Sequence, residues 1–127
     1  MKPKKPILTE QELEIMKIVW RTGSVTVRDV YEELLSRRKI AYTTVMTMMG
    51  VLEQKGHLKK NAEERAYVYT AAQPQREVVG NMVQEFVKRV FNGSAKPLLV
   101  HLIEDKKISP EELDEIRKLL KDKRRRK

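Results

Sequence analysis

The chain has 127 residues, a formal net charge of +9, 40% hydrophobic residues and no cysteine. This composition excludes a disordered chain, disulfides and thiolate metal sites, and no apolar run approaches the ~20 residues that span a bilayer. The positive charge favours a polyanionic partner. Because the basic N-terminus lacks the apolar stretch of a signal peptide, we expect a cytoplasmic protein without membrane insertion.

Three short helices are predicted in close succession in the first half of the chain. A capping box at Thr9 opens a helix that runs to about residue 21. A short extended stretch at 24–26 follows, and Thr26 then caps a second helix. The third helix is predicted over 41–56, with a glycine as its C-cap. This order is typical of a helix-turn-helix domain.

The predicted helix 41–56 has two faces of different character. The side suited to a core carries Val45, Met48, Met49 and Leu52. The other side is small, uncharged and hydroxyl-bearing, and carries Thr43, Thr44, Thr47, Gly50, Val51 and Gln54. A solvated helix face in so charged a chain would carry lysine and glutamate. We therefore expect this side to meet base edges, with the three threonines nearest the bases and Val51 on a thymine methyl.

After residue 56 the apolar pattern changes from period 3.6 to period 2. Strands at 57–60 and 65–70 around a polar turn at 61–64 form a predicted hairpin, which would be a wing after the third helix. The side chains expected to contact DNA outside the third helix are basic or aromatic: Arg37, Arg38, Lys39, Lys59, Lys60, Arg65 and Tyr67. The alternative is a hairpin that only covers the core.

The residues around Pro74 mark a boundary, so we expect domains at 1–73 and 74–127. The second domain is predicted to hold helices at about 75–91, 94–106 and 110–124. About fifty residues cannot bury so wide an apolar surface alone, which favours a two-fold dimer. The residues expected in the dimer interface are apolar: Val79, Met82, Val83, Phe86, Val90, Leu98, Leu102, Ile103, Leu113, Ile116 and Leu120. The alternative is that these helices pack back on the first domain.

The sequence contains no constellation typical of a catalytic or metal site. His57 and His101 lie in different segments without paired acids at ligand spacing, and we expect both to be ordinary surface or boundary residues. Glycine-rich phosphate loops, nucleophile elbows and zinc-protease motifs are also absent. We therefore expect neither enzyme activity nor a cofactor or metal.

The motifs assembled so far resemble the BlaI/MecI-type penicillinase repressor family over nearly the whole chain. The resemblance is carried by LTEQELEIMKIVW at 8–20, AYTTVMT at 41–47, LEQKG at 52–56, RAYVY at 65–69, FNG at 91–93 and the last helix. It implies a mainly α protein with a winged helix-turn-helix N-terminal domain, a small β-hairpin wing and a three-helix C-terminal dimerisation domain. It also implies a dimeric, sequence-specific transcriptional repressor on inverted-repeat operators, with β-lactam-resistance or related stress genes as candidate targets.

Two departures from the family pattern limit what the resemblance implies. The copper-responsive branch ends in a cysteine-rich metal motif, and this chain has no cysteine. The antibiotic-resistance branch is released by proteolysis at an Asn-Phe pair, through a protease linked to a membrane sensor. The matching positions here are His101 and Leu102, which leaves cleavage at this bond and the inducing signal open. The rival to a repressor is a winged-helix protein–protein interaction module that binds no DNA.

Overall fold

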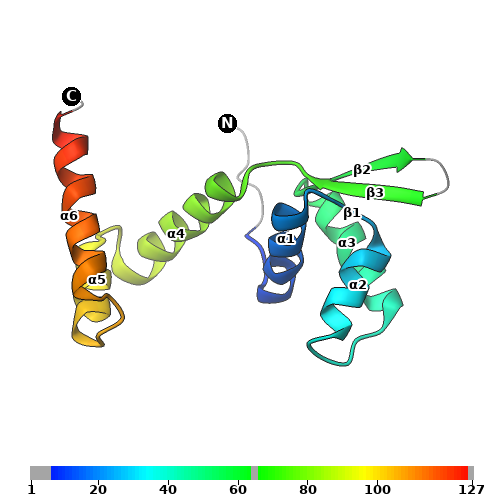
Figure 1. Ribbon diagram of the computed structural model, residues 1–127, viewed down its shortest axis with the longest axis horizontal. Coiled ribbons are helices and arrows are strands. Elements are labelled where there is room, and N and C mark those ends of the chain that lie inside the picture. The colour runs from blue at the N-terminus through cyan, green and yellow to red at the C-terminus, as the bar shows by residue number, and fades with distance from the viewer. Residues whose placement is uncertain (1–6, 64–65, 126–127) are drawn as a thin grey trace. The chain divides into compact units, whose positions relative to one another are not determined.

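The computed structural model describes residues 7–63 and 66–125 (Figure 1). Its elements follow in the order α1 (Glu10–Thr22), β1 (Ser24–Val25), α2 (Val27–Leu35), α3 (Tyr42–Gln54), β2 (Leu58–Glu63), β3 (Ala66–Ala71), α4 (Gln75–Phe91), α5 (Lys96–Glu104) and α6 (Pro110–Arg125). Helices dominate, and the strands form a small three-stranded sheet. The predicted fold class, mainly α with a winged helix-turn-helix and three C-terminal helices, is confirmed.

The sheet has the strand order β1-β3-β2, and both neighbouring pairs are antiparallel. The hairpin ladder runs from the pair Leu58–Ala71 to the pair Glu63–Ala66. The predicted turn was therefore too long: residues 61–63 belong to β2, because each of them has a partner in the β-rich strand opposite. Strand β1, expected only as an extended stretch, pairs with β3 and joins the α1–α2 connection to the hairpin.

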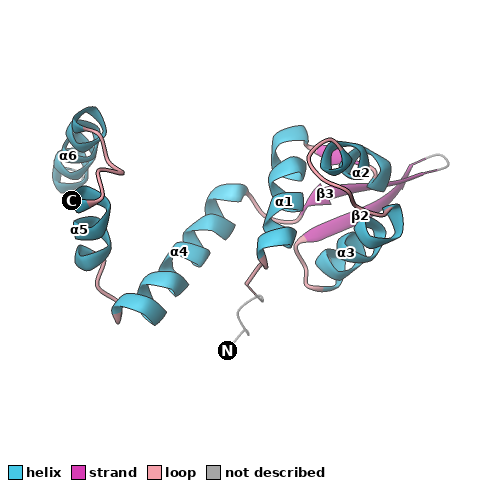
Figure 2. Cartoon of the chain, turned by 90° about the horizontal axis from the view of Figure 1, so that it is seen from below, coloured by secondary structure: helices cyan, strands magenta, loops and turns pink. Residues whose placement is uncertain are grey.

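Helices α1, α2 and α3 lie on one side of the sheet and enclose the core of the N-terminal unit (Figures 1 and 2). The buried core residues are Leu8, Ile15, Met16, Ile18, Val19, Val25, Val30, Leu34, Val45, Met49, Leu52, Leu58, Tyr69 and Val78. The inner side of α3 was predicted correctly, and Met48 packs partly buried at the edge of the core. Burying one side of α3 leaves its other side free to meet a partner.

The ends of α1, α2 and α3 follow from local chemistry. Thr9 and Thr26 each form the predicted capping box, with the threonine hydroxyl accepting from the third helical amide at 3.2 and 3.1 Å. Residues 55 and 56 follow the last turn of α3, and Gly56 has φ 85°. Only glycine adopts this conformation readily, so Gly56 lets the chain turn from α3 directly into β2.

Two compact units divide the chain between Met82 and Val83, inside α4. The predicted boundary before Pro74 lies at the start of this helix, whose early residue Val78 is buried in the N-terminal core. Met82, predicted as a dimer residue, also packs partly buried against that core. The division into a DNA-binding and a dimerisation domain stays a prediction.

The C-terminal unit contains the second part of α4 together with α5 and α6. Helix α5 is shorter than predicted, since it begins after Ala95 with a proline in its first turn and ends before Lys106, which has φ 57°. The predicted box at Ser109 is present, with the Glu112 amide 3.1 Å from the serine hydroxyl oxygen. Among the described residues, no helix is long and apolar enough to cross a membrane.

Candidate nucleic-acid interface

The outer side of α3 is exposed and free of charge. The threonines at 43, 44 and 47 and Gln54 are exposed, and Val51 is 36% exposed. Gly50 lies among them without a Cβ and with open space around it. The side therefore offers hydroxyl groups, methyl groups and one amide on a rigid helix whose opposite side is fully buried. Such groups can bond to base edges and pack on thymine methyls.

Met46 also lies on this outer side, at 47% exposed, and was missed by the sequence reasoning. Met46 stands one turn after Tyr42, which is 40% exposed and makes an edge-to-face contact with Tyr31 of α2 at 5.4 Å. The signal that could have found it is helical position, because at about 100° per residue Met46 lies about 40° from Gly50 and about 100° from Val45 around the helix. The exposed side of α3 is thus more apolar than predicted.

The hairpin places positive charge beyond the core. Lys59 and Lys60 of β2 are exposed, and Tyr67 of β3 is 56% exposed. The Lys60 ammonium lies 4.1 Å from the centroid of the Tyr67 ring, so the tyrosine holds the cation in place. Arg65, predicted as a further contact, lies outside the described residues. The described part of the wing can therefore present two lysines to a phosphate backbone.

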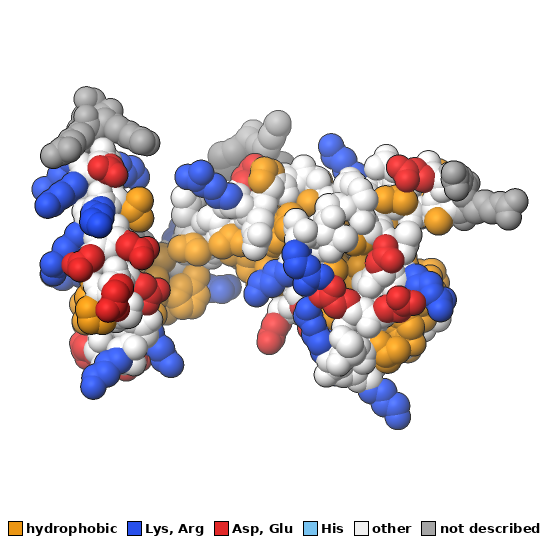
Figure 3. Space-filling view, in the orientation of Figure 1, with side chains coloured by type: hydrophobic (Ala, Val, Ile, Leu, Met, Phe, Trp, Pro, Cys, Tyr) orange, Lys and Arg blue, Asp and Glu red, His pale blue; other side chains and the backbone are white. Residues whose placement is uncertain are grey.

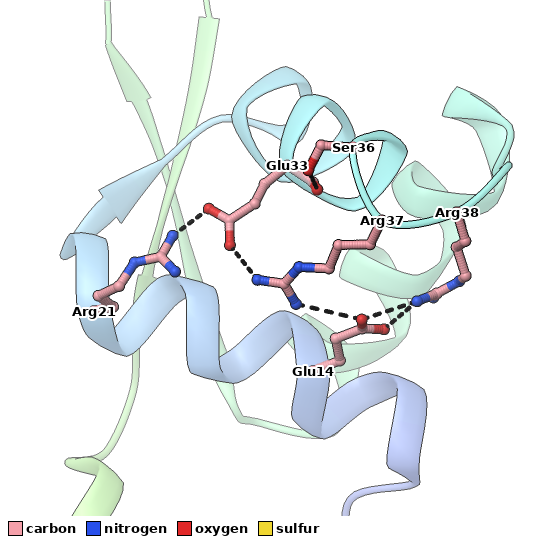
Figure 4. A network of polar contacts seen from close by, with 6 residues as sticks. All are labelled: Glu14, Arg21, Glu33, Ser36, Arg37 and Arg38. Carbon is pink, nitrogen blue, oxygen red and sulfur yellow. Dashed lines mark hydrogen bonds and ion pairs between the residues drawn. The ribbon is translucent and has the colours of Figure 1, made fainter.

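Arg37 and Arg38, also predicted as phosphate contacts, bind carboxylates of their own domain. Arg37 Nη2 lies 2.6 Å from Glu33 Oε2, and Arg38 Nη1 lies 2.6 Å from Glu14 Oε1 (Figure 4). Helix α2 ends before them, so they occupy the connection to α3. Lys39 is exposed and forms no ion pair within the described part of the chain. Of the three basic residues predicted before α3, Lys39 is thus the one that forms no ion pair with a described carboxylate.

A half-buried ion pair fixes the C-terminal end of α3. Lys55 Nζ lies 2.8 and 2.9 Å from the two carboxylate oxygens of Glu12, which is only 6% exposed. Burial raises the pKa of Glu12, but the hydrogen bonds from Lys55 and Thr9 outweigh burial, so the pKa lies below its ordinary value of 4.5. Glu12 therefore caps α1 and holds α3 with the same carboxylate.

Replacing Glu12 by glutamine should remove the ion pair while keeping the cap, since glutamine also closes a capping box. At neutral pH we expect the free energy of unfolding to fall by about 1.5–3 kcal/mol, typical of a hydrogen bond to a charged group. The pKa of Glu12 is lower in the folded protein than its ordinary value of 4.5. The ion pair therefore stabilises the fold fully above pH 4.5, and this stabilisation is lost as pH falls through the pKa of the folded protein. Urea unfolding at about pH 7 and pH 3 checks this; an equal loss at both would contradict it.

The C-terminal unit exposes much of its apolar surface (Figure 3). Val83, Phe86 and Val90 of α4 are 49%, 42% and 50% exposed and follow one face of the helix. Ile103 and Leu120 are also exposed, while Leu98, Leu102, Leu113 and Ile116 are half-buried within the unit. Leu99, Val100 and Leu119, which are not among the predicted interface residues, are exposed as well, the last at 67%.

The two histidines differ in environment. His57 is buried at 4% exposed in the connection from α3 to β2, so the expectation of a surface or boundary residue was wrong for it. Its backbone amide donates to the Leu52 carbonyl and its carbonyl accepts from the Ala72 amide, both at 2.9 Å, which holds this segment between α3 and the end of β3. His101 is exposed on α5 and contacts the Phe91 ring at 6.1 Å. Among the described residues no group of three metal-ligating side chains occurs.

Comparison with known proteins covers both units. The sequence model of the penicillinase repressor family matches residues 8–122. The Bacillus licheniformis penicillinase repressor is 29% identical over 122 residues, which cover 96% of this chain and 95% of that protein. The Mycobacterium tuberculosis transcriptional regulator BlaI is 36% identical over 115 residues, 89% of this chain and 82% of that protein.

A structure solved on DNA is among those similar to this chain in both fold and sequence. The solution structure of monomeric Bacillus licheniformis BlaI in complex with the blaP half-operator superposes with a TM-score of 0.52 at 32% identity. The match covers 58% of this chain and 90% of that chain. The similar protein was thus solved on DNA.

Proposed function

The chain belongs to the penicillinase repressor family, whose members are transcriptional repressors and not enzymes, and we propose that it binds inverted-repeat operator DNA as a homodimer in the cytoplasm. In this proposal α3 enters the major groove and the β2–β3 hairpin lies along the backbone. The C-terminal helices pair two copies so that two α3 helices meet two half-sites.

The observation that carries the proposal is the outer side of α3. Thr43, Thr44 and Thr47 would meet base edges, and Val51 together with Met46 would pack on thymine methyls. None of these side chains makes a bidentate contact with a base. We therefore infer modest specificity for each half-site, with DNA shape and the pairing of half-sites adding the rest.

In this proposal the phosphate contacts come from the hairpin and from the residues just before α3. Lys59 and Lys60 on the hairpin and Lys39 before α3 are exposed cations, and Tyr67 can donate its hydroxyl. Arg65 is retained in the proposal from the sequence. Helix α3 has Ala41 as its N-cap residue and no side-chain cap, so its first amides can also face a phosphate. The pairing of Arg37 and Arg38 with carboxylates favours a role inside the domain for both.

The homodimer is supported by the apolar surface of the C-terminal unit. Val83, Phe86 and Val90 form an exposed stripe on α4, and exposed leucines and isoleucines on α5 and α6 extend the apolar surface of this unit. Contiguous apolar surface of this kind marks an interaction site. A two-fold dimer covers the same patch on both copies, which matches an inverted repeat.

Release of the repressor by a protease linked to a membrane sensor is part of the proposal, with the His101–Leu102 bond as its site. Both residues lie inside α5, where their carbonyl groups accept from the amides of Asp105 and Lys107 at 3.0 and 2.9 Å. A protease that takes an extended substrate would therefore have to unwind α5 first. Cleavage there would separate α6 from the rest of the chain.

Selection from a pool of random duplexes tests DNA recognition without a known operator. We expect enrichment of an inverted repeat whose half-site centres are about one helical turn, ~10 bp, or a multiple of it apart. Sequencing of the bound fraction gives the result. The rival, a winged-helix protein–protein module, predicts no enrichment and no binding to random duplex even at low salt, and either finding would overturn the repressor proposal.

A further inference from the structure

Five charged side chains join α1, α2 and the connection before α3 in one network (Figure 4). Glu33 binds Arg21 and lies 2.6 Å from Arg37 Nη2. Arg37 Nη1 lies 3.4 Å from Glu14, and Arg38 Nη1 contacts both oxygens of Glu14 at 2.6 and 2.8 Å. The network alternates in charge from one end to the other, so each carboxylate lies between two guanidinium groups.

We expect this network to contribute more to stability than an isolated surface ion pair does. Isolated exposed ion pairs add little to the free energy of unfolding, whereas networks with well-formed contacts to low-mobility groups add more. The side chains of Glu14 and Glu33 are only 24% and 25% exposed. Hydrogen bonding from Arg21 and the positive charge of Arg37 hold the pKa of Glu33 below its ordinary value despite partial burial, so Glu33 stays ionised at neutral pH.

The network acts on the connection before α3, where Ile40 also packs partly buried against the core. Helices α1 and α2 each begin with a capping box, but α3 has Ala41 as its N-cap residue and no side-chain cap. The amides of Arg37 and Arg38 both donate to the Leu34 carbonyl, which continues α2 only as far as residue 38. Between there and α3, the ion pair of Arg38 with Glu14 ties the connection to α1 just after the chain leaves α2.

We propose that Glu14 and Arg38 are positioning residues that fix the entry of α3 and thereby set operator discrimination, and that Arg38 does not contact phosphate. This inference rests on the proposed function. A displaced α3 start moves Thr43, Thr44 and Thr47 relative to the base edges, whereas contacts made by the hairpin lysines stay in place. Loss of the tie should therefore affect operator DNA and leave random DNA unchanged.

The test compares Glu14→Gln, Arg38→Gln and the double variant on the selected operator and on a random duplex. We expect each single variant to bind operator about fivefold more weakly, as for loss of one well-formed pair, with the double variant no worse. Random-duplex affinity and the slope of its logarithm against log salt should not change. Glu10→Gln removes the same charge one turn earlier on α1 from a residue without an ion pair in the described part of the chain, and should leave operator affinity unchanged.

A charge exchange separates positioning from phosphate contact. Arg38→Glu alone should weaken operator binding, and adding Glu14→Arg should restore most of it. If Arg38 contacts phosphate, Arg38→Gln will instead weaken both DNAs, lower the salt slope by about one unit, and resist rescue. That result would overturn the inference. The inference would also be overturned if Glu14→Gln bound operator DNA with the same affinity as Glu10→Gln. Failure of the wild-type protein to distinguish the two DNAs would overturn the proposed function itself.

Discussion

Replacing Phe86 by glutamate is expected to convert the protein to monomers and to weaken operator binding by about 10²–10⁴-fold. Phe86 is 42% exposed at the centre of the α4 stripe, between Val83 and Val90. In a two-fold dimer the substitution places two charges in one apolar interface, where each loses its hydration. Light scattering gives the oligomeric state, and fluorescence anisotropy with a labelled operator gives the affinity.

The matched control for this prediction is Gln84→Glu. Gln84 is exposed on the opposite side of the same helix, so the variant introduces the same residue and should remain a dimer. Because the Phe86 ring also contacts Phe91 at 5.8 Å, Val90→Glu serves as a second variant that leaves this contact intact. If both stripe variants remain dimers, α4 is not the interface. A monomeric wild-type protein would favour the alternative in which the C-terminal helices pack on their own N-terminal domain.

Most of the N-terminal fold could be predicted because its signals are local. Thr9 and Thr26 each lie three residues before an acid, and the capping boxes that they form define two helix starts in the structure. Val45, Met49 and Leu52 recur at helical spacing and are fully buried. Capping boxes and helical spacing involve residues only a few positions apart, so they can be recognised without knowing how the rest of the chain folds.

The sequence is least informative where a residue's role depends on distant partners. The ion pair of Arg38 could not be predicted because its partner Glu14 lies 24 residues earlier in the sequence. Met46 was assigned to neither side of α3, and the packing of α1, α2 and β2 decides which side of that helix is covered. Met82 belongs to an apolar band that two units share, and the sequence pattern cannot divide that band between them.

Thr47→Ala in α3 and Lys60→Ala in the hairpin should weaken DNA binding in different ways. Thr47 is exposed at the middle of the outer side of α3, and its loss should weaken operator binding by the roughly 1–3 kcal/mol of a base contact while sparing random DNA. Lys60 lies on the hairpin beside Tyr67, and its loss should weaken both DNAs alike and lower the salt slope by about 0.9. Anisotropy titrations on both duplexes at several salt concentrations measure both effects.

Two further variants identify the contact that Thr47 makes. Thr47→Val keeps the methyl group and removes the hydroxyl, so it should reproduce the alanine effect if the hydroxyl bonds a base edge, and should be neutral if only the methyl packs on thymine. Thr22→Ala removes an exposed threonine at the end of α1 and should change neither affinity. Equal losses on both duplexes for Thr47→Ala would show that α3 contacts the backbone and that the bases are read elsewhere. The hairpin would then be the next element to test, because it carries the other exposed side chains of the proposed interface.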